Sequence, residues 1–258
     1  MKVLPRPVRQ LALAMGLSAA VTVALGPPAE AAVLGGIHDG WLPRVLTSAP
    51  ADADAGRSAR FLLVEIDRDL AVTARPGGGR IVGTMPAASR FYRTPAMAWV
   101  RRTSADGRYG LVDVPYVAEP RSGWIRLRGL ERSWTRVRVI VDLSEHRLTL
   151  RRGPDVLLRA PAATGAPASP TPRGPFVVTD RVAFPGGGSL GTYAFGMSGI
   201  QPNLPAGWTG GDQLAIHGTN APSTIGRSAS AGCLRVSEAV LARLKPLLRL
   251  GTPVVVRA

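Results

Sequence analysis

The sequence predicts a mainly β protein with two β-rich parts and one helix near the C-terminus. Short apolar stretches separated by turn-forming residues recur from Phe61 onward, which is the pattern of short strands. The 258 residues include 30 glycines and 23 prolines, and such a composition disfavours a bundle of helices. The single cysteine excludes a small fold held by disulfides. The length allows one or two domains, each able to bury a hydrophobic core.

Residues 1–31 have the three parts of a secretory signal peptide. Basic residues precede an apolar run at 11–26, and Ala29-Glu30-Ala31 supplies small residues for cleavage. The run is shorter than the ~18 residues expected of a membrane-spanning helix. We therefore expect cleavage after Ala31 and an extracytoplasmic protein, in the cell wall or periplasmic space. An uncleaved segment is the one predicted route to a membrane.

Residues 32–60 show no sustained strand or helix period, which predicts a linker or flexible arm. Residues 61–132 follow as a small β-rich domain, because apolar stretches there alternate with turn clusters such as Pro76-Gly77-Gly78-Gly79. The predicted strands of this domain are Phe61–Ile66, Trp99–Arg101, Tyr109–Val112 and Gly123–Leu127.

A second β-rich domain is predicted at 136–258. Val137, Val139 and Val141 alternate with polar residues, as in a strand with one buried face. One helix is expected, capped by Ser237, continuing to Leu244 and disturbed by Pro246. The remaining predicted elements are strands at Leu148–Leu150, Val156–Leu158, Phe176–Thr179, Gln213–His217 and Val254–Val256, a hairpin turn at Arg152–Asp155 and a proline-rich loop at 161–175.

The formal net charge of +15 suits three classes of partner: nucleic acid, an anionic membrane face and an acidic wall polymer. Export argues against nucleic acid. Lys2 and Lys245 are the two lysines among 32 basic residues, a skew that also fits codon bias rather than a dedicated binding surface. Anionic wall polymers therefore stay open as partners.

The chain offers few pairs for cysteine and histidine chemistry, since it contains Cys233 and three histidines. These are too widely spaced for a metal site, so we expect no metal and no cofactor. An unpaired thiol is a liability in an oxidising compartment, which favours a nucleophile over a small buried side chain. A free thiol is mostly protonated at neutral pH and needs a base nearby. His217, 16 residues upstream and beside Gly218, is the best candidate.

Four motifs and one hairpin resemble the L,D-transpeptidases of bacterial cell walls, which have a YkuD-type catalytic domain. The resemblance spans about Arg136 to Arg257 and predicts a YkuD-like β-sandwich or barrel. The segments that carry it are His217-Gly218-Thr219-Asn220, Ser230-Ala231-Gly232-Cys233-Leu234-Arg235, Pro170-Thr171-Pro172-Arg173-Gly174-Pro175-Phe176 and Gly251-Thr252-Pro253-Val254, together with a hairpin at Val139–Leu150.

The resemblance implies a cysteine-dependent acyl transfer that cross-links peptidoglycan, with roles in wall biosynthesis, wall organisation and cell shape. Cys233 would attack the carbonyl of the third stem-peptide residue, release the terminal D-alanine and hold a thioester for an acceptor amine. His217 would act as the base, or hold the thiolate as an ion pair. Carbapenems would acylate the same thiol. Donor and acceptor stem peptides are the implied partners, and a monomer is expected.

The resemblance also implies a substrate-binding set around the nucleophile. Gly232 and Ser230 would shape an oxyanion pocket, and Gly218 would lie beside the imidazole. Arg235 would bind a substrate carboxylate, or instead form a salt bridge that holds its loop. Tyr193 would line the pocket, with core packing as the alternative.

One position departs from the family, since many members have histidine where this chain has Ala231. That leaves His217 as the single imidazole. No carboxylate beside it in sequence is an obvious orienting group: Asp212 is better suited to a turn, so a backbone carbonyl is the expected partner.

Alternatives remain open on the same evidence. A carboxypeptidase would use water in place of the amine, depending on how well a lid, predicted at Ala183–Asp212, excludes water. An inactive wall-binding protein would not need Cys233 at all. Sortases share the order His, Cys, Arg but space the pair more widely. Around Trp124 the upstream part resembles small Src-homology-type barrels, which would bind wall polymer or act as a spacer.

Overall fold

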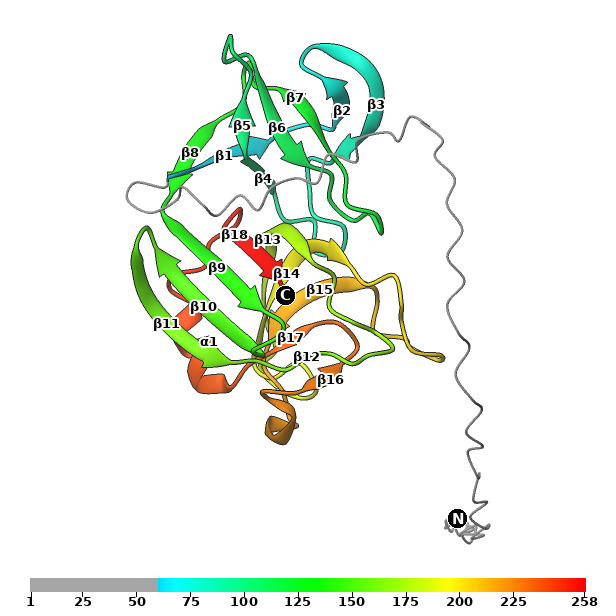
Figure 1. Cartoon of the computed structure of the whole chain (residues 1–258), viewed down its shortest axis with the longest axis vertical. Coiled ribbons are helices and arrows are strands. Elements are labelled where there is room, and N and C mark those ends of the chain that lie inside the picture. Colours follow the sequence, from blue (N-terminus) through cyan, green and yellow to red (C-terminus); the bar gives the residue numbers. More distant parts are fainter. Residues whose placement is uncertain (1–59) are drawn as a thin grey trace, which may run out of the picture. The chain divides into compact units, whose positions relative to one another are not determined.

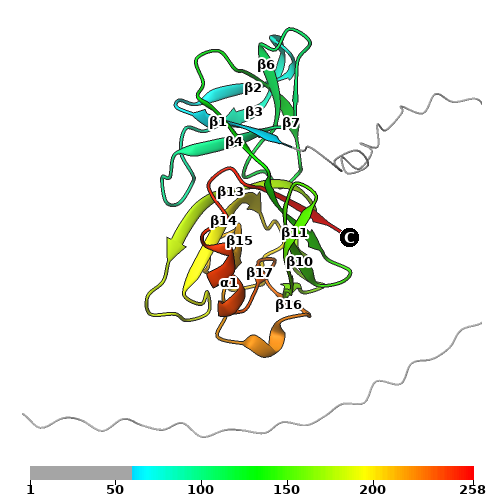
Figure 2. The same cartoon turned by 90° about the vertical axis from the view of Figure 1, so that its left-hand side faces the viewer.

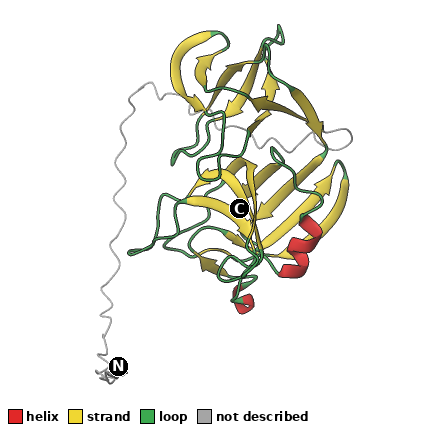
Figure 3. Ribbon diagram, turned by 180° about the vertical axis from the view of Figure 1, so that it is seen from behind, coloured by secondary structure: helices red, strands yellow, loops and turns green. Residues whose placement is uncertain are grey.

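The computed structural model describes residues 60–258, and strands dominate this part of the chain (Figure 1). Within residues 60–258, helix is confined to α1 (Glu238–Leu244) and the 3-10 turn η1 (Pro222–Thr224), as Figure 3 shows. The predicted mainly β fold class is confirmed. The predicted signal peptide at 1–31 and the predicted arm at 32–60, apart from Arg60, lie outside the described residues. No helix in the described part of the chain is long and apolar enough to span a membrane.

The first eight strands form two antiparallel sheets. Their orders are β4-β1-β8 and β3-β2-β7-β6-β5. β1 lies between two neighbours because nearly all of its residues are apolar and buried. The bounds are β1 (Phe61–Ile66), β2 (Leu70–Arg75), β3 (Gly78–Met85), β4 (Ala96–Val100), β5 (Arg102–Thr103), β6 (Tyr109–Asp113), β7 (Ser122–Arg126) and β8 (Arg132–Thr135).

The four strands predicted in this part are present as β1, β4, β6 and β7. β4 begins at Ala96, three residues before the predicted start at Trp99. β2 and β3 have no counterpart in the prediction. Half of their residues are exposed, and only Val72 and Met85 are buried in the core. A strand with so few buried positions has little apolar signal to detect.

The C-terminal part contains an eight-stranded sheet in the order β11-β10-β9-β18-β13-β14-β15-β17. β18 is parallel to β9 and β15 is parallel to β17, while the other neighbours are antiparallel. A separate parallel pair joins β12 and β16. The bounds are β9 (Val137–Asp142), β10 (Arg147–Arg152), β11 (Asp155–Pro161), β12 (Thr164–Gly165), β13 (Gly174–Ala183), β14 (Tyr193–Ile200), β15 (Gln213–His217), β16 (Ser228–Ser230), β17 (Leu234–Arg235) and β18 (Pro253–Arg257).

The long strand β13 curls this sheet. Its first half, Gly174–Val177, pairs with β18, and its second half pairs with β14. A register shift between Val178 and Asp180 separates the two halves, and such a bulge bends a strand and increases its twist. The sheet therefore wraps around one apolar core as a curled half-barrel, and a single core cluster joins side chains from both of its ends.

Helix α1 packs against this core (Figure 2). The Ser237 hydroxyl accepts a hydrogen bond from the Val240 N–H at 3.3 Å, which confirms the predicted N-cap. Leu241 and Leu244 are fully buried in the same cluster as Ile216 and Leu234. The helix thus covers the side of the sheet opposite the face that carries His217 and Cys233.

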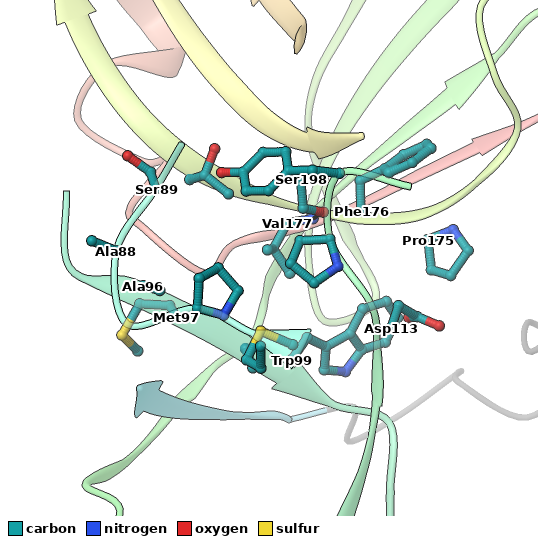
Figure 4. Close-up of a pocket in the computed structure, with 16 residues that line it drawn as sticks. Ala88, Ser89, Ala96, Met97, Trp99, Asp113, Pro175, Phe176, Val177 and Ser198 are labelled. Carbon is teal, nitrogen blue, oxygen red and sulfur yellow. Dashed lines mark hydrogen bonds between the residues drawn. The ribbon is translucent and has the colours of Figure 1, made fainter. Parts of the chain in front are cut away.

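The two β-rich parts are in direct contact within residues 60–258. Met97 and Trp99 of β4 meet Phe176 of β13 around a cavity of about 30 Å³ (Figure 4). A cavity of this size holds one or two water molecules. The Tyr116 N–H donates to the Ser198 carbonyl at 2.7 Å. This region is therefore a packed interface rather than a ligand site.

Candidate active site

The parallel pair β15 and β17 brings His217 and Cys233 to one face of the sheet. His217 is the last residue of β15, and Cys233 immediately precedes β17. Ile216 is opposite Leu234 in the register, and both side chains are fully buried in the core. Because side chains alternate along a strand, His217 and Cys233 point to the other face, as the sequence pattern predicts for His217.

Both side chains line a single cavity of about 210 Å³. Ala231 and Arg235 line it as well. His217 is 3% exposed, whereas Cys233 is half-buried. The thiol donates to the Gln213 carbonyl at 3.8 Å, and in the described part of the chain no hydrogen bond joins it directly to the imidazole. A ligand in the cavity would therefore reach both groups.

A backbone carbonyl orients the imidazole. His217 Nδ1 lies 2.5 Å from the Gly218 oxygen. Since a carbonyl oxygen can only accept, Nδ1 carries the proton, and Nε2 of the neutral ring keeps its lone pair. Asp212 is engaged elsewhere, because Arg90 Nη1 contacts both of its carboxylate oxygens at 2.9 Å. The expectation of a carbonyl in place of Asp212 is confirmed.

The resting pair is neutral. Burial lowers the pKa of His217 to about 4, and the positive charge of Arg235 lowers it as well. The hydrogen bond to Gly218 acts in the opposite direction and raises this pKa. Burial raises the pKa of the Cys233 thiol, although a backbone hydrogen bond from Ala215 and the charge of Arg235 oppose this. At neutral pH the site therefore holds a thiol and an imidazole. Of the two predicted states, a thiol with a base fits better than an ion pair.

Comparison with protein families identifies the domain that carries these residues. The model of the YkuD L,D-transpeptidase catalytic domain matches residues 136–256. This part of the chain belongs to the YkuD family. The match covers β9 to β18 almost completely and contains both His217 and Cys233.

The curated relatives of this YkuD domain come from bacilli. The YkuD protein of Bacillus licheniformis is 32% identical over 117 residues, covering 45% of this chain and 63% of that protein. The Bacillus subtilis YkuD protein is 30% identical over 118 residues, covering 46% and 64%. This chain thus spans less than two thirds of either relative. Among solved structures, L,D-transpeptidase 3 from Mycobacterium tuberculosis is 17% identical, with a TM-score of 0.42, covering 62% of this chain and 82% of that one.

Arg235 of the YkuD domain faces the cavity without an acidic partner. Its Nη1 lies 3.5 Å from the Ala229 carbonyl, and its buried Nε has no hydrogen-bond partner. In residues 60–258 no ion pair includes Arg235, so the alternative of a loop-holding salt bridge is not observed. A buried guanidinium nitrogen without a partner is suited to an incoming acceptor.

Ser230 and Gly232 hold the loop that carries the nucleophile. Ser230 Oγ donates to the Cys233 carbonyl at 2.6 Å and accepts from the Gly232 N–H at 3.1 Å. Thr171, from the proline-rich motif, donates to the Gly232 carbonyl at 2.8 Å. Neither Ser230 nor Gly232 lines the cavity. Because the Gly232 N–H is already used, the Cys233 N–H is the better candidate for an oxyanion donor.

Replacement of Gly232 by alanine will destabilise this loop. Gly232 has a φ of +114°, and an added Cβ would lie 2.2 Å from Gln201 Nε2. Gln201 is itself fixed by the Ser169 and Pro170 carbonyls. We expect a loss of about 2 kcal/mol or more in the free energy of unfolding, measured by urea denaturation. Gly78→Ala is the control, since nothing lies within 4 Å of its Cβ position. An equal effect of the two substitutions would contradict this account.

Gly218 and Tyr193 are not among the residues that line the cavity, and their substrate-binding roles stay predictions. Gly218 packs so closely on Gly191 and the Glu238 carboxylate that a Cβ would lie 2.2 Å from Glu238 Oε1. Tyr193 packs against the core and beneath Lys245, whose Nζ lies 4.7 Å from the ring centroid. Its neighbour Ala194 lines the cavity instead, because successive residues of β14 face opposite sides. Tyr193 therefore makes the contacts that the core-packing alternative expects.

The predicted lid at Ala183–Asp212 is not one segment. Its middle forms β14 inside the sheet, which contributes Ala194 and Gly196 to the cavity, and loops at 184–192 and 201–212 flank this strand and line the cavity as well. Other wall residues have no counterpart in the sequence prediction, notably Phe91 and Tyr92 of the loop at 86–95. Two adjacent aromatic residues between Pro86 and Pro95 were the sequence signal from which this part of the wall could have been predicted. In the described residues no group of His, Cys, Asp or Glu is arranged to hold a metal ion.

Proposed function

We propose that this protein is a peptidoglycan L,D-transpeptidase that acts outside the cytoplasm and cross-links stem peptides through Cys233. The observation that carries the proposal is the cavity shared by Cys233 and His217. In it the chain's only thiol faces a neutral imidazole whose unprotonated nitrogen is the one not bound to Gly218. Membership of the YkuD family supports the same reaction class. Peptidoglycan stem peptides are the proposed donor and acceptor.

Acylation begins when the sulfur of Cys233 attacks the carbonyl carbon of the third stem residue and its proton moves to His217 Nε2. The carbonyl oxygen becomes an oxyanion, which the Cys233 N–H stabilises. When the intermediate collapses, the C–N bond to the terminal D-alanine breaks and Nε2 returns the proton to the leaving amine. The products are a thioester at Cys233 and free D-alanine.

Deacylation repeats these steps with a second stem peptide. Its side-chain amine attacks the thioester carbonyl and loses a proton to His217 Nε2. The C–S bond breaks, and Nε2 protonates the departing sulfur. An amide cross-link and the resting thiol result. One imidazole serves both halves, so Ala231 in place of the frequent family histidine leaves a complete proton path.

Arg235 is the proposed binding group for the donor's terminal carboxylate. Its guanidinium faces the cavity, and its Nε has no partner within the described residues. Its positive charge also lowers the pKa of His217, although burial is the larger cause. It therefore helps to keep the base unprotonated while it attracts an anionic substrate.

Acylation by a carbapenem tests the proposal. The strained lactam carbonyl reports an activated thiol without the need for a second substrate. We expect the reduced, folded protein to gain the mass of one carbapenem, measured by intact mass spectrometry. A protein that forms no adduct is not an L,D-transpeptidase, and a wall-binding role replaces the proposal.

The fate of the acyl-enzyme separates transferase from hydrolase. With a stem tetrapeptide and an acceptor amine we expect D-alanine release and an amide-linked dimer, resolved by liquid chromatography and mass spectrometry. Release of the tripeptide acid in place of dimer identifies an L,D-carboxypeptidase on the same fold.

A further inference from the structure

An aromatic and aliphatic rim surrounds the mouth of the catalytic cavity. Seven large hydrophobic side chains are exposed in residues 60–258, and four of them line this one cavity. Exposed apolar side chains that cluster at one place mark a binding surface, whereas scattered ones need no explanation. The rim residues, with their exposed fractions, are Phe91 (47%), Tyr92 (53%), Leu190 (37%) and Trp208 (44%).

The rim comes from three loops, one of which belongs to the upstream β part. Phe91 and Tyr92 lie on the loop between β3 and β4, residues 86–95. Leu190 lies between β13 and β14, and Trp208 between β14 and β15. The indole of Trp208 is held by a hydrogen bond from Nε1 to the Gly211 carbonyl at 2.7 Å. The upstream part therefore contributes Phe91 and Tyr92 to the wall of the cavity.

A buried carboxylate anchors the β3–β4 loop to the YkuD domain. Asp180 on β13 is 0% exposed, and its Oδ1 accepts from both Ser89 Oγ and Thr94 Oγ1, the latter at 2.9 Å. These two residues bracket the aromatic pair and also bond to each other, Thr94 N to Ser89 Oγ at 3.0 Å. A fully buried carboxylate with several donors holds its partners firmly. The loop is thus fixed at both of its ends.

The same anchor reaches the nucleophile. Asp180 Oδ2 accepts a hydrogen bond from Gln213 Nε2 at 2.9 Å, and the Gln213 carbonyl accepts a hydrogen bond from the Cys233 thiol. On the outer side Arg90 pairs with Asp212, the residue before Gln213. The β3–β4 loop, which carries Phe91 and Tyr92, and strand β15, whose Gln213 contacts the sulfur, are therefore both hydrogen-bonded to Asp180. Rings on a loop with fixed ends, lining the same cavity as Cys233, are suited to select a substrate.

We propose that Phe91 and Tyr92 form a specificity-determining wall of the substrate site, which binds the donor stem peptide beside its scissile bond. This inference rests on the proposed function. A peptide fits better than a sugar, because the aliphatic Leu190 completes the rim and the cavity continues without interruption to Cys233. Methyl and methylene groups of a stem peptide would be removed from water against these side chains.

Steady-state kinetics with a free stem tetrapeptide test the proposal. In the double variant Phe91→Ala/Tyr92→Ala we expect KM to rise about 30-fold, as for the loss of two well-placed aromatic contacts, while kcat stays within about threefold. Alkylation of Cys233 by iodoacetamide should keep its rate, because that small reagent needs no wall. Ile81→Ala is the matched control, because Ile81 lies in the same β part and is 65% exposed. The KM of this variant should equal that of the wild type.

Three results would overturn the inference. One is an unchanged KM in the double variant. Another is an equal KM rise in Ile81→Ala. The third is a KM rise with the disaccharide-linked peptide but not with the free peptide, which would assign the rings to the glycan.

A wild-type protein without turnover defeats the proposed function but not this test. Calorimetric binding of the tetrapeptide to Cys233→Ala then replaces kinetics. The wall still predicts a dissociation constant that is about 30-fold weaker when Phe91 and Tyr92 are also replaced by alanine, and an equal dissociation constant overturns it.

Discussion

Replacement of Cys233 by alanine will abolish covalent labelling and turnover. The chain contains no second thiol, so no neighbouring cysteine can take over the acyl group. Loss of a catalytic nucleophile commonly lowers kcat on the order of 10⁶-fold, which is below detection for an enzyme of ordinary rate. Intact mass after exposure to a carbapenem should show the unmodified protein, and D-alanine release from a tetrapeptide should reach background.

This variant is expected to fold. Alanine removes one sulfur atom from a half-buried position, and the thiol makes only a long contact to Gln213. A thermal unfolding midpoint within a few degrees of the wild type is the control. An adduct that persists in the alanine variant would show that another group carries the acyl chain, and would refute the mechanism proposed for Cys233.

Loss of the His217 base will slow acylation about 10²- to 10⁴-fold without preventing it. His217→Asn is the sharper variant, because its amide can still donate to the Gly218 carbonyl that receives Nδ1 in the native site. Alanine would remove both the base and this hydrogen bond. The rate of carbapenem adduct formation, followed by mass against time, measures the effect. Rates within twofold of the wild type in His217→Asn would exclude general-base catalysis by this residue.

The wild-type pH profile gives a second test of the same residue. The imidazole must be neutral to accept the thiol proton, so acylation is lost as the pH falls through its pKa. Burial places this pKa at about 4, and the acid limb should therefore lie near pH 4. At pH 5 an imidazole with the ordinary pKa of 6.5 is about 97% protonated, whereas this one stays mostly neutral. An acid limb at 6 to 7 would show a solvated imidazole and contradict the buried geometry, and His217→Asn should lack this limb.

The strand arrangement explains why the two reactive side chains are found together. His217 and Cys233 are 16 residues apart in sequence, and between them lie η1 and β16. The parallel pairing of Ile216 with Leu234 places the end of β15 beside β17. Because side chains alternate along a strand and these two are buried on one face, His217 and Cys233 point to the other face. Burial then makes both groups neutral at rest. The same packing therefore supplies proximity and determines the protonation states.

The sequence by itself determined the mainly β class and the capped helix, and it singled out Cys233 and His217 as the candidate catalytic pair. Alternation of apolar and polar residues is a local property, and it identified β9 and the face of β15 that carries His217. Ser237 was recognisable because an N-cap depends on the few residues that follow it. Cys233 and His217 were recognisable because one cysteine and three histidines allow few possible pairs. Their motifs also resemble those of a known family.

Only the tertiary structure decided what surrounds that pair. Phe91, Leu190 and Trp208 lie on three loops whose meeting place depends on how strands far apart in sequence pair. Gly218 and Tyr193 pack against neighbours from other elements, Glu238 and Lys245 respectively. The anchor at Asp180 joins residues about 90 positions apart. Long-range contacts of this kind leave no periodic trace in the sequence, since each partner alone is an ordinary serine, threonine or aspartate on a strand or loop.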